Sequence, residues 1–467
     1  MGVGGLPNQP QPVLIISHEI VGSRMTGPGI RYYQLARVLS REFPVTLAMP
    51  SGSDLAPSQN LAILPYHNGQ DAALEQPIRH ARAILVPAVS FTSVPFLAQT
   101  SAPLIIDGYD PFVAETFLVM ADTAAQQVAL TQAYLAGDFF ICASERQRDW
   151  WLGTLEANGR VNRYTYGEDS SLRRLVDLVP FGLPETPPQH TRQIVKGVLH
   201  GICKTDRVLL WGGGLWPWLD PLTAIRAVAK IWEQRRDVRL IFPGTRHPNP
   251  GMSKITTHLP AARDLANGLG LLDRAIFFGD WVPYADWQNV LLESDLALTL
   301  HGSETLESRL AFRSRVLDYI WAGLPVVATR GDATGELIVQ YQVGLMVEPQ
   351  KVEAVAEAIL RLLEESREVW RMRFDRARAA LTWERAAQPL CEFCRAPRQA
   401  PDKAALGERL GNPFYVDTIR KLRADNVGLQ DDRTRWQSLA QAYEQRRVVR
   451  LINFVQRWAS LFKRTSK

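Results

Sequence analysis

Four residues of one short stretch, Arg313, Ser314, Arg315 and Asp318, have the types and spacing to bind a phosphorylated ligand. We predict that a helix begins at these residues. The amino end of a helix attracts anions through its unpaired N–H groups and its dipole, and arginine and serine side chains add donors for phosphate oxygens. Asp318 shares a helix face with Ser314, so its carboxylate could accept ribose hydroxyls. The pattern favours a nucleoside diphosphate site, although arginines at a helix start are also commonly solvated.

The residues around this group predict the elements that position it. In the stretch 312–329, apolar residues recur at helical spacing, and Gly323 followed by Pro325 predicts the end of the helix before a buried strand. The same alternation of apolar runs and helical patterns recurs along the chain. We expect strands at 13–17, 45–49, 83–86, 103–106 and 139–143, and then at 208–211, 238–242, 276–279, 296–300, 326–328 and 344–347.

This alternation predicts an α/β fold with two Rossmann-like doubly wound domains facing a cleft, followed by a C-terminal amphipathic helical tail. We expect a disordered N-terminus (1–12), a first domain (13–184), a linker (185–205), a second domain (206–396) and the tail (397–467). A tight glycine turn is expected at 27–29, after the first strand. Its spacing is not the G-x-G-x-x-G of a dinucleotide site.

Three segments carry a resemblance to a known family. Residues 317–328 (LDYIWAGLPVVA), 179–183 (VPFGL) and 335–338 (GELI) resemble retaining glycosyltransferases of the GT-B fold, family 4, also called glycosyl transferases group 1. The resemblance implies transfer of a sugar from a UDP- or GDP-sugar to a hydroxyl of a saccharide or lipid-linked acceptor, with retention and without a metal ion or other cofactor. It also implies a place in bacterial cell-surface polysaccharide or glycolipid synthesis.

The resemblance and the placement of residues after strands together nominate three groups of site residues. The donor would be held by residues of the second domain, and the acceptor would lie against the first. The donor-binding group is Gly213, Gly214, His301, Ser314, Arg315, Asp318 and Glu336; the catalytic group is Glu304, Glu307 and Arg315; the acceptor or cleft group is His18, Gly27, Gly29, Arg31 and Asp110. Asp110 could equally cap the helix that follows it.

Two departures from the family pattern leave a second hypothesis open. No basic residue occurs between Val208 and Arg226, where the family usually has an arginine and a lysine for the diphosphate. Leu310 stands where the family commonly has its first glutamate. Arg315 is the best-placed substitute for the missing charge. The alternative is a non-catalytic nucleotide-sugar-binding or assembly protein on the same scaffold.

Composition limits the class of protein. An apolar content of 46%, a charged content of 22% and four cysteines in 467 residues are typical of a globular protein without a disulfide framework. The start of the chain has no basic n-region or hydrophobic h-region, so we expect a cytoplasmic protein. C-x-x-C at 391–394 falls in a helical pattern without a second ligand pair, so a metal site is not expected.

The last residues, 445–467, differ from the rest in charge. They contain seven Lys or Arg and no acid, whereas the whole chain has a net charge of +5, so the remainder is slightly acidic. This distribution argues against nucleic acid as a partner of the two domains. Apolar residues recur there on one side of a helical pattern. The tail could therefore lie on an anionic membrane surface, at the inner face of the cell membrane, or pack against a partner helix.

Overall fold

The computed structural model describes residues 11–91, 93–118, 123–248, 258–411, 413–444 and 447–462. Contacts divide the chain into two compact units, residues 1–405 and 406–467. The first unit holds both sheets and is described first. Most of the segment expected to be disordered (1–12) lies outside the described residues.

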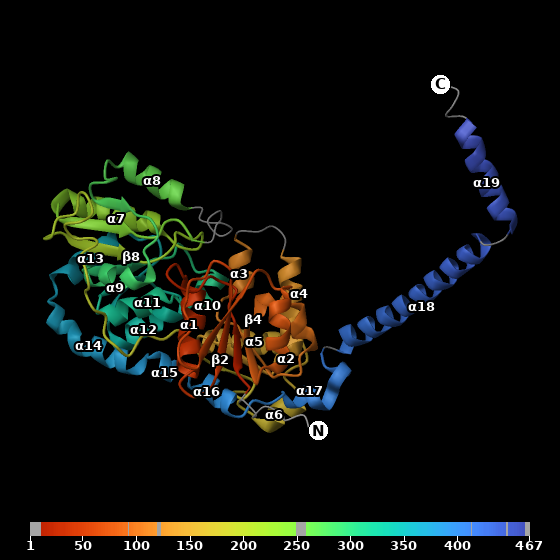
Figure 1. The fold of residues 1–467 in the computed structure, drawn as a ribbon. Coiled ribbons are helices and arrows are strands. Elements are labelled where there is room, and N and C mark those ends of the chain that lie inside the picture. The colour runs from red at the N-terminus through yellow and green to blue at the C-terminus, as the bar shows by residue number, and fades with distance from the viewer. Residues whose placement is uncertain are drawn as a thin grey trace. The chain divides into compact units, whose positions relative to one another are not determined.

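The first half of this unit is built on a seven-stranded parallel sheet in the order β3-β2-β1-β4-β5-β6-β7. Helices cover both faces of the sheet (Figure 1). The five strands expected here form, and β3 and β7 at the two edges were not predicted. The strands are β1 (Val13–Ile16), β2 (Val45–Pro50), β3 (Leu61–Tyr66), β4 (Ala83–Pro87), β5 (Leu104–Asp107), β6 (Phe139–Cys142) and β7 (Val176–Leu178).

The separate glycine turn expected at 27–29 does not form, because these residues begin helix α1. The α-helices of this half are α1 (Gly27–Leu39), α2 (Glu75–His80), α3 (Phe112–Thr116), α4 (Ala124–Ala136), α5 (Glu145–Ala157) and α6 (Arg163–Glu168). Gly27, Pro28 and Gly29 form the first turn of α1 instead of a separate turn, because proline fits the start of a helix. A Cβ atom at Gly29 would lie 2.4 Å from the Ile20 carbonyl oxygen, so glycine allows close packing there.

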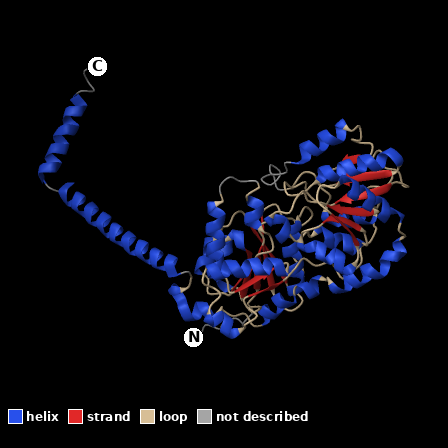
Figure 2. Cartoon of the chain, turned by 180° about the vertical axis from the view of Figure 1, so that it is seen from behind, coloured by secondary structure: helices blue, strands red, loops and turns tan. Residues whose placement is uncertain are grey.

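The second half is a six-stranded parallel sheet in the order β10-β9-β8-β11-β12-β13, again with helices on both faces (Figure 2). All six strands expected from the sequence form. The strands are β8 (Arg207–Trp211), β9 (Val238–Phe242), β10 (Ile276–Phe278), β11 (Leu296–Thr299), β12 (Val326–Thr329) and β13 (Gly344–Val347). The helices are α7 (Pro221–Gln234), α8 (His258–Gly268), α9 (Tyr284–Leu292), α10 (Leu306–Leu310), α11 (Arg315–Ala322), α12 (Ala333–Tyr341) and α13 (Val352–Glu364).

Three helices after the second sheet, α14 (Arg367–Ala380), α15 (Trp383–Ala386) and α16 (Gln388–Arg395), return the chain to the first half. The backbone of Leu183 bridges to Thr382, and the rings of Phe139 and Phe393 stack with their centroids 4.9 Å apart. This return was implied by the resemblance and is confirmed. Buried residues on one face of the first sheet therefore share a continuous apolar core with the second sheet, which includes Phe181 and Trp383.

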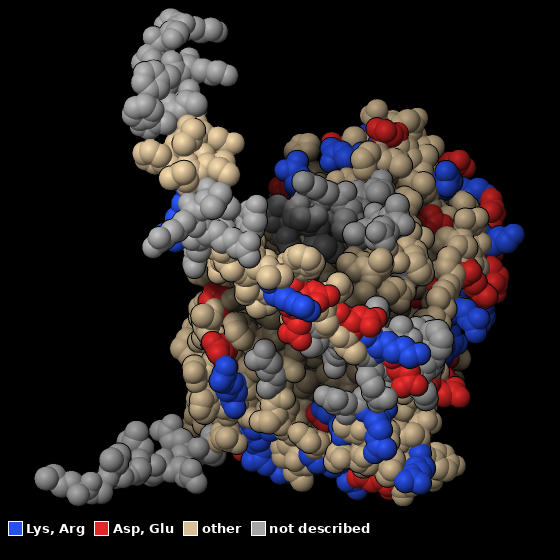
Figure 3. All heavy atoms as spheres, turned by 90° about the vertical axis from the view of Figure 1, so that its right-hand side faces the viewer, with Lys and Arg blue, Asp and Glu red and all other residues tan. Residues whose placement is uncertain are grey.

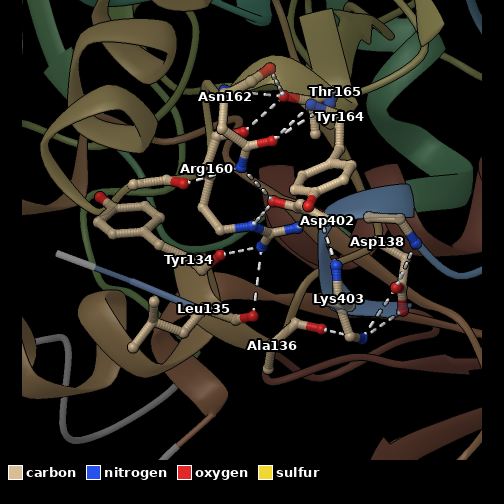
Figure 4. A network of polar contacts seen from close by, with 12 residues as sticks. Tyr134, Leu135, Ala136, Asp138, Arg160, Asn162, Tyr164, Thr165, Asp402 and Lys403 are labelled. Carbon is tan, nitrogen blue, oxygen red and sulfur yellow. Dashed lines mark hydrogen bonds and ion pairs between the residues drawn. The ribbon is translucent and has the colours of Figure 1, made fainter. Parts of the chain in front are cut away.

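Helix α17 (Pro401–Leu406) packs on the first half of the same unit, although its residues were expected to belong to the tail. Asp402 and Arg160 form a two-point ion pair, with nitrogen–oxygen distances of 2.7 and 3.1 Å and both side chains fully buried. Lys403 donates to Asp138 at 2.8 Å beside this pair (Figure 4).

The second unit contains α18 (Pro413–Glu444) and α19 (Arg447–Phe462). Large apolar side chains on both helices are exposed: Leu429, Trp436 and Leu439 on α18, and Leu451, Ile452, Phe454 and Val455 on α19. In the part of the chain that the structure describes, no helix is long and apolar enough to cross a membrane. On the molecular face drawn in Figure 3, Lys and Arg side chains lie interspersed with Asp and Glu.

Candidate functional site

A cleft with a volume of about 330 Å³ lies between the two halves of the first unit, where the carboxyl ends of the strands of both sheets meet. This is where ligands of doubly wound folds bind. From the first half, His18 follows β1 and Asp110 follows β5; from the second, Gly212–Gly214 follow β8 and Trp281 follows β10. Of the nominated residues, His18, Gly27, Asp110, Gly213, Gly214, Ser314, Arg315 and Asp318 line this cleft.

Arg315 and the glycine loop after β8 form one side of the cleft. Gly213 has a φ of +96°, and a Cβ atom there would lie 3.2 Å from Nη2 of Arg315. The hydroxyl of Tyr319 on α11 accepts a hydrogen bond of 2.9 Å from the Gly212 N–H, which ties the loop to the helix. Nη1 of Arg315 is buried without a hydrogen-bond partner among the described residues. The guanidinium is thus placed to supply the positive charge that the sequence lacks after Gly214.

The amino ends of two helices converge at this side of the cleft. Ser314 is the N-cap residue of α11, and its side chain makes no capping hydrogen bond. A Cβ atom at Gly27, the first residue of α1, would lie 3.6 Å from the Ser314 hydroxyl oxygen. Both helix ends carry partial positive charge, so the space between them and Arg315 favours an anion.

Asp318 lies one turn along α11 and also faces the cleft. One of its carboxylate oxygens, Oδ2, accepts a hydrogen bond of 2.9 Å from the indole of Trp287. Burial raises the pKa of Asp318 to about 6, and the bond from Trp287 and the charge of Arg315 oppose this rise. The carboxylate is mainly ionised at neutral pH, with Oδ1 left to accept a further hydrogen bond.

Four nominated acidic and histidine residues do not line the cleft. Glu307 is 1% exposed and binds Arg313 through two hydrogen bonds of 2.6 and 2.9 Å, so its carboxylate is already neutralised. His301 is buried, and its Nε2 lies 2.9 Å from the Arg330 carbonyl oxygen. Glu304 is exposed outside the cleft lining. Glu336 pairs with Arg146 at 2.6 Å. This placement argues against the expected catalytic roles of Glu304 and Glu307 and the donor-binding roles of His301 and Glu336.

On the first half, Arg31 lies in the lining of a smaller hollow that also includes His18 and Asp110. Its guanidinium forms two hydrogen bonds, of 2.7 and 3.0 Å, with Asp107, and the side chains of both residues are 1% exposed. It also lies 4.7 Å from the centre of the Tyr109 ring. Arg31 is therefore absent from the lining of the larger cleft, but lies beside His18 and Asp110, so an acceptor role for it stays a prediction. Gly29 is a packing residue, because it meets the Ile20 backbone.

Two titratable groups of the first half do face the cleft. Burial lowers the pKa of His18 to about 4, so its ring is neutral at pH 7, and its Nδ1 is buried without a hydrogen-bond partner among the described residues. Burial, and then the nearby Asp107 charge, raises the pKa of Asp110 to about 7. A neutral imidazole and a carboxyl group that titrates near neutrality can both exchange hydrogen bonds with a hydroxyl acceptor.

Sequence reasoning missed a row of aromatic side chains on the cleft wall of the second half. The rings of Trp216 and Trp218 stack at 5.4 Å, and His247 lies 5.7 Å from Trp216 and 6.0 Å from Trp281. These flat apolar faces suit a base or a sugar ring. The unusual Trp-Pro-Trp sequence after the glycine loop was the signal that could have found them. Among the described residues, no three His, Cys, Asp or Glu side chains gather in a way that could hold a metal ion.

Comparisons with known proteins show a partial family match and a shared fold. Residues 206–365 match the family model described as glycosyl transferases group 1. The chitobiosyldiphosphodolichol beta-mannosyltransferase of Debaryomyces hansenii is 31% identical over 100 residues. That match spans 21% of this chain and only about a fifth, 21%, of the relative's own length.

Solved structures share the fold over most of the chain. Sucrose-phosphate synthase from Thermosynechococcus elongatus superposes with a TM-score of 0.61 at 14% identity, over 82% of this chain and 98% of that one. Anabaena Alr3699/HepE, solved in complex with UDP and glucose, superposes with a TM-score of 0.58 at 14% identity, over 83% of this chain and 100% of that one. The first unit has the GT-B fold, with two Rossmann-like domains and a cleft between them.

Proposed function

We propose that this chain is a glycosyltransferase that moves a sugar from a nucleoside diphosphate donor to a hydroxyl acceptor. The observation that carries the proposal is the position of Arg315. Its buried guanidinium, with one nitrogen free of hydrogen bonds to described residues, lies against Gly213 where the amino ends of α1 and α11 converge. A diphosphate is the ligand chemistry that such a group of donors suits best.

The same group supplies the chemistry of the transfer. When the bond between the sugar carbon and the diphosphate oxygen breaks, negative charge grows on the diphosphate and positive charge on the sugar. Arg315, Ser314 and the N–H groups at the start of α11 would stabilise the leaving diphosphate. Asp318 would hold the ribose. These donors act in place of a metal ion, so we propose a metal-independent reaction whose rate is unchanged by a chelator.

Retention of the sugar's configuration is part of the proposal and rests on the resemblance of the α11 segment to retaining enzymes. Nuclear magnetic resonance of the first product formed tests it, because the anomeric coupling shows whether the new bond has the donor's configuration. UDP- and GDP-sugars are both proposed donors. The UDP complex of Anabaena Alr3699/HepE supports a UDP-sugar donor. The mannosyltransferase relative leaves a GDP-sugar donor open.

The acceptor would bind on the wall formed by the first half, with its hydroxyl near His18 and Asp110. We propose a saccharide or a lipid-linked saccharide, in the synthesis of a bacterial cell-surface polysaccharide or glycolipid. The name of the Debaryomyces hansenii relative specifies a diphosphodolichol-linked acceptor, which supports the lipid-linked choice.

The side-chain pattern of helix α19 supports our proposal that this protein is cytoplasmic and binds the inner face of the membrane. One side of the helix is apolar and exposed, and it carries Leu451, Ile452 and Val455. The opposite side carries Arg450 and Arg457. An apolar face flanked by basic residues is typical of helices that lie on anionic lipid. A partner helix is the alternative occupant of this face.

One observation favours a second candidate, a non-catalytic nucleotide-sugar-binding protein. Among the described residues, the lysine and arginine residues that line the cleft are Arg313 and Arg315, and Arg313 is already paired with Glu307. A site with one available guanidinium could bind a donor without activating it.

The test is nucleoside diphosphate release and product formation from a panel of UDP- and GDP-sugars, with Arg315→Ala and Asp318→Ala as variants. We expect wild-type protein to turn over at least one donor, and each variant to lose at least tenfold in kcat/KM. Binding of a donor without turnover, with acceptors from both classes present, would favour the non-catalytic candidate. Equal turnover by wild type and both variants would contradict a site built on α11.

A further inference from the structure

The loop before α11, taken here as residues 310–314 from the last residue of α10 to the N-cap of α11, is held from the first half of the unit by two buried side chains. The Tyr109 hydroxyl donates to the Phe312 carbonyl oxygen at 2.8 Å. The Gln147 amide donates from Nε2 to the Leu310 carbonyl oxygen at 2.9 Å and to the Tyr109 carbonyl oxygen at 2.7 Å. This loop leads directly into Ser314 and Arg315.

Both side chains are themselves fixed. Gln147 on α5 is 2% exposed, and its Oε1 accepts a hydrogen bond of 2.7 Å from the Ala143 N–H. Because that bond fixes which end of the amide is the donor, Nε2 must point at the two carbonyls. Tyr109 is 8% exposed, and its ring lies under the Arg31 guanidinium, which Asp107 holds in turn.

From its own half, the loop is held by Arg313. The Arg313 N–H donates to the Thr334 hydroxyl at 2.6 Å, and its guanidinium pairs with Glu307. The second half therefore fixes one side of the loop, and Tyr109 and Gln147 fix the other across the cleft. An opening of the two halves would break the bonds from Tyr109 and Gln147 and leave those of Arg313 intact.

We infer that Tyr109 and Gln147 are positioning residues that set the loop before α11, so that Ser314 and Arg315 meet the donor diphosphate only when the two halves are closed. This inference rests on the proposed function, because it assigns a role in donor binding. Gln147 lies outside the cleft lining, whereas Tyr109 is part of it. They act through two backbone carbonyls of the loop, so their effect falls on the diphosphate and not on the nucleoside.

The test compares binding of UDP and GDP with binding of uridine and guanosine, by calorimetry on the full chain, and adds a thermal melt. Tyr109→Phe keeps the ring under Arg31 and removes one hydrogen bond, and we expect about a fivefold loss for the preferred diphosphate. Gln147→Glu places a carboxylate against two carbonyl oxygens, and we expect at least a tenfold loss. The affinity of each variant for the matching nucleoside should stay within twofold of wild type.

A matched control is Gln34→Met. Gln34 on α1 also donates across the two halves, to the Tyr284 hydroxyl at 3.1 Å, but does not contact the loop before α11. Its diphosphate affinity should stay within twofold of wild type. In combination with Arg315→Ala, Tyr109→Phe should cause a smaller further loss than it does alone, because Ser314 is then the one positioned side chain that remains.

The outcomes separate the two claims. If wild type does not prefer a diphosphate over its nucleoside, the proposed function fails. If wild type shows the preference and both Tyr109→Phe and Gln147→Glu retain it unchanged, the positioning role fails alone. A loss that falls equally on diphosphate and nucleoside and follows the melting temperature would also overturn the inference, because it indicates a general structural role.

Discussion

At the scale of single residues, Arg315 differs from Arg313 in that no carboxylate of the described residues forms an ion pair with it. Arg313 makes two hydrogen bonds to Glu307, although its Nε has no hydrogen-bond partner among the described residues. Within the same described part of the chain, Nη1 of Arg315 has no partner, and the one hydrogen bond of Asp318 is accepted by Oδ2. Sequence spacing placed Ser314, Arg315 and Asp318 on the cleft side of one helix. It could not show that Glu307 would turn to Arg313, because that pairing depends on how α10 ends.

Asp110 gives a prediction about stability. Burial and the charge of Asp107 raise its pKa to about 7, whereas an aspartate in an unfolded chain titrates near 4. Protonation of Asp110 therefore stabilises the folded protein relative to the unfolded chain. This contribution is fully present below about pH 4 and is lost as the pH rises through about 7. Asp110→Asn should raise the melting temperature at pH 8.5, by an effect on the order of 1 kcal/mol, and should raise it by about a third as much at pH 5.

Thermal melts of both proteins at the two pH values provide the measurement. A melting-temperature difference of the same size at pH 5 and pH 8.5 would show that the ionisation of Asp110 does not cost the folded state stability.

At the scale of elements, the central strands were predictable and the edge strands were not. β1, β8 and β11 are continuous apolar runs because both of their faces are buried. β3 was missed because it lies at an edge, with exposed residues at Ala62 and Pro65. The start of α1 was misassigned because glycine is usual in turns, whereas here Gly29 serves packing against Ile20.

The glycine loop after β8 gives a second prediction. Gly213→Ala should weaken UDP or GDP binding at least tenfold, because a side chain is strained at its φ of +96° and would press on Arg315. Gly153→Ala is the control: Gly153 lies inside α5, and a Cβ atom there would meet nothing within 4 Å. The control should bind the nucleotide normally and melt slightly higher, since alanine favours helix by about 1 kcal/mol. Normal nucleotide binding by Gly213→Ala would show that the glycine loop after β8 is not part of the nucleotide site.

Helix α19 gives a third prediction, measured by sedimentation of the full chain with lipid vesicles. Wild type should bind phosphatidylserine-containing vesicles more tightly than phosphatidylcholine vesicles, and added salt should weaken the binding. Exchanging Leu451 and Val455 for glutamine should abolish it, whereas Asn453→Gln on the polar side should not. Equal binding to both vesicle types would contradict a preference for anionic lipid. No binding to either type, together with concentration-dependent dimerisation, would favour a partner helix.

At the scale of the whole chain, the two sheets of the first unit form one body because the chain crosses between them more than once. Phe181 and Trp383 connect the apolar core across both halves, and α15 to α17 fasten the end of the unit to the first sheet. The sequence predicted two domains and a return of the helices. It did not predict how far the return extends, because Arg160 and Asp402 are 242 residues apart.

The Arg160–Asp402 pair gives the prediction at this scale. Asp402→Ala leaves a fully buried guanidinium without its carboxylate, which costs about 3–5 kcal/mol and should lower the melting temperature markedly. The control is Glu353→Ala, which breaks an exposed pair with Lys230 and should leave the melting temperature unchanged. A melting temperature of Asp402→Ala equal to wild type would show that α17 is not needed to hold the unit together.

The central claim is that the start of α11 holds a diphosphate through Arg315. Calorimetric titration of UDP, GDP and their nucleosides into wild type and Arg315→Ala tests it most directly. The account predicts that wild type prefers a diphosphate over its nucleoside by at least tenfold and that Arg315→Ala loses most of this preference. An undiminished preference in Arg315→Ala would contradict it.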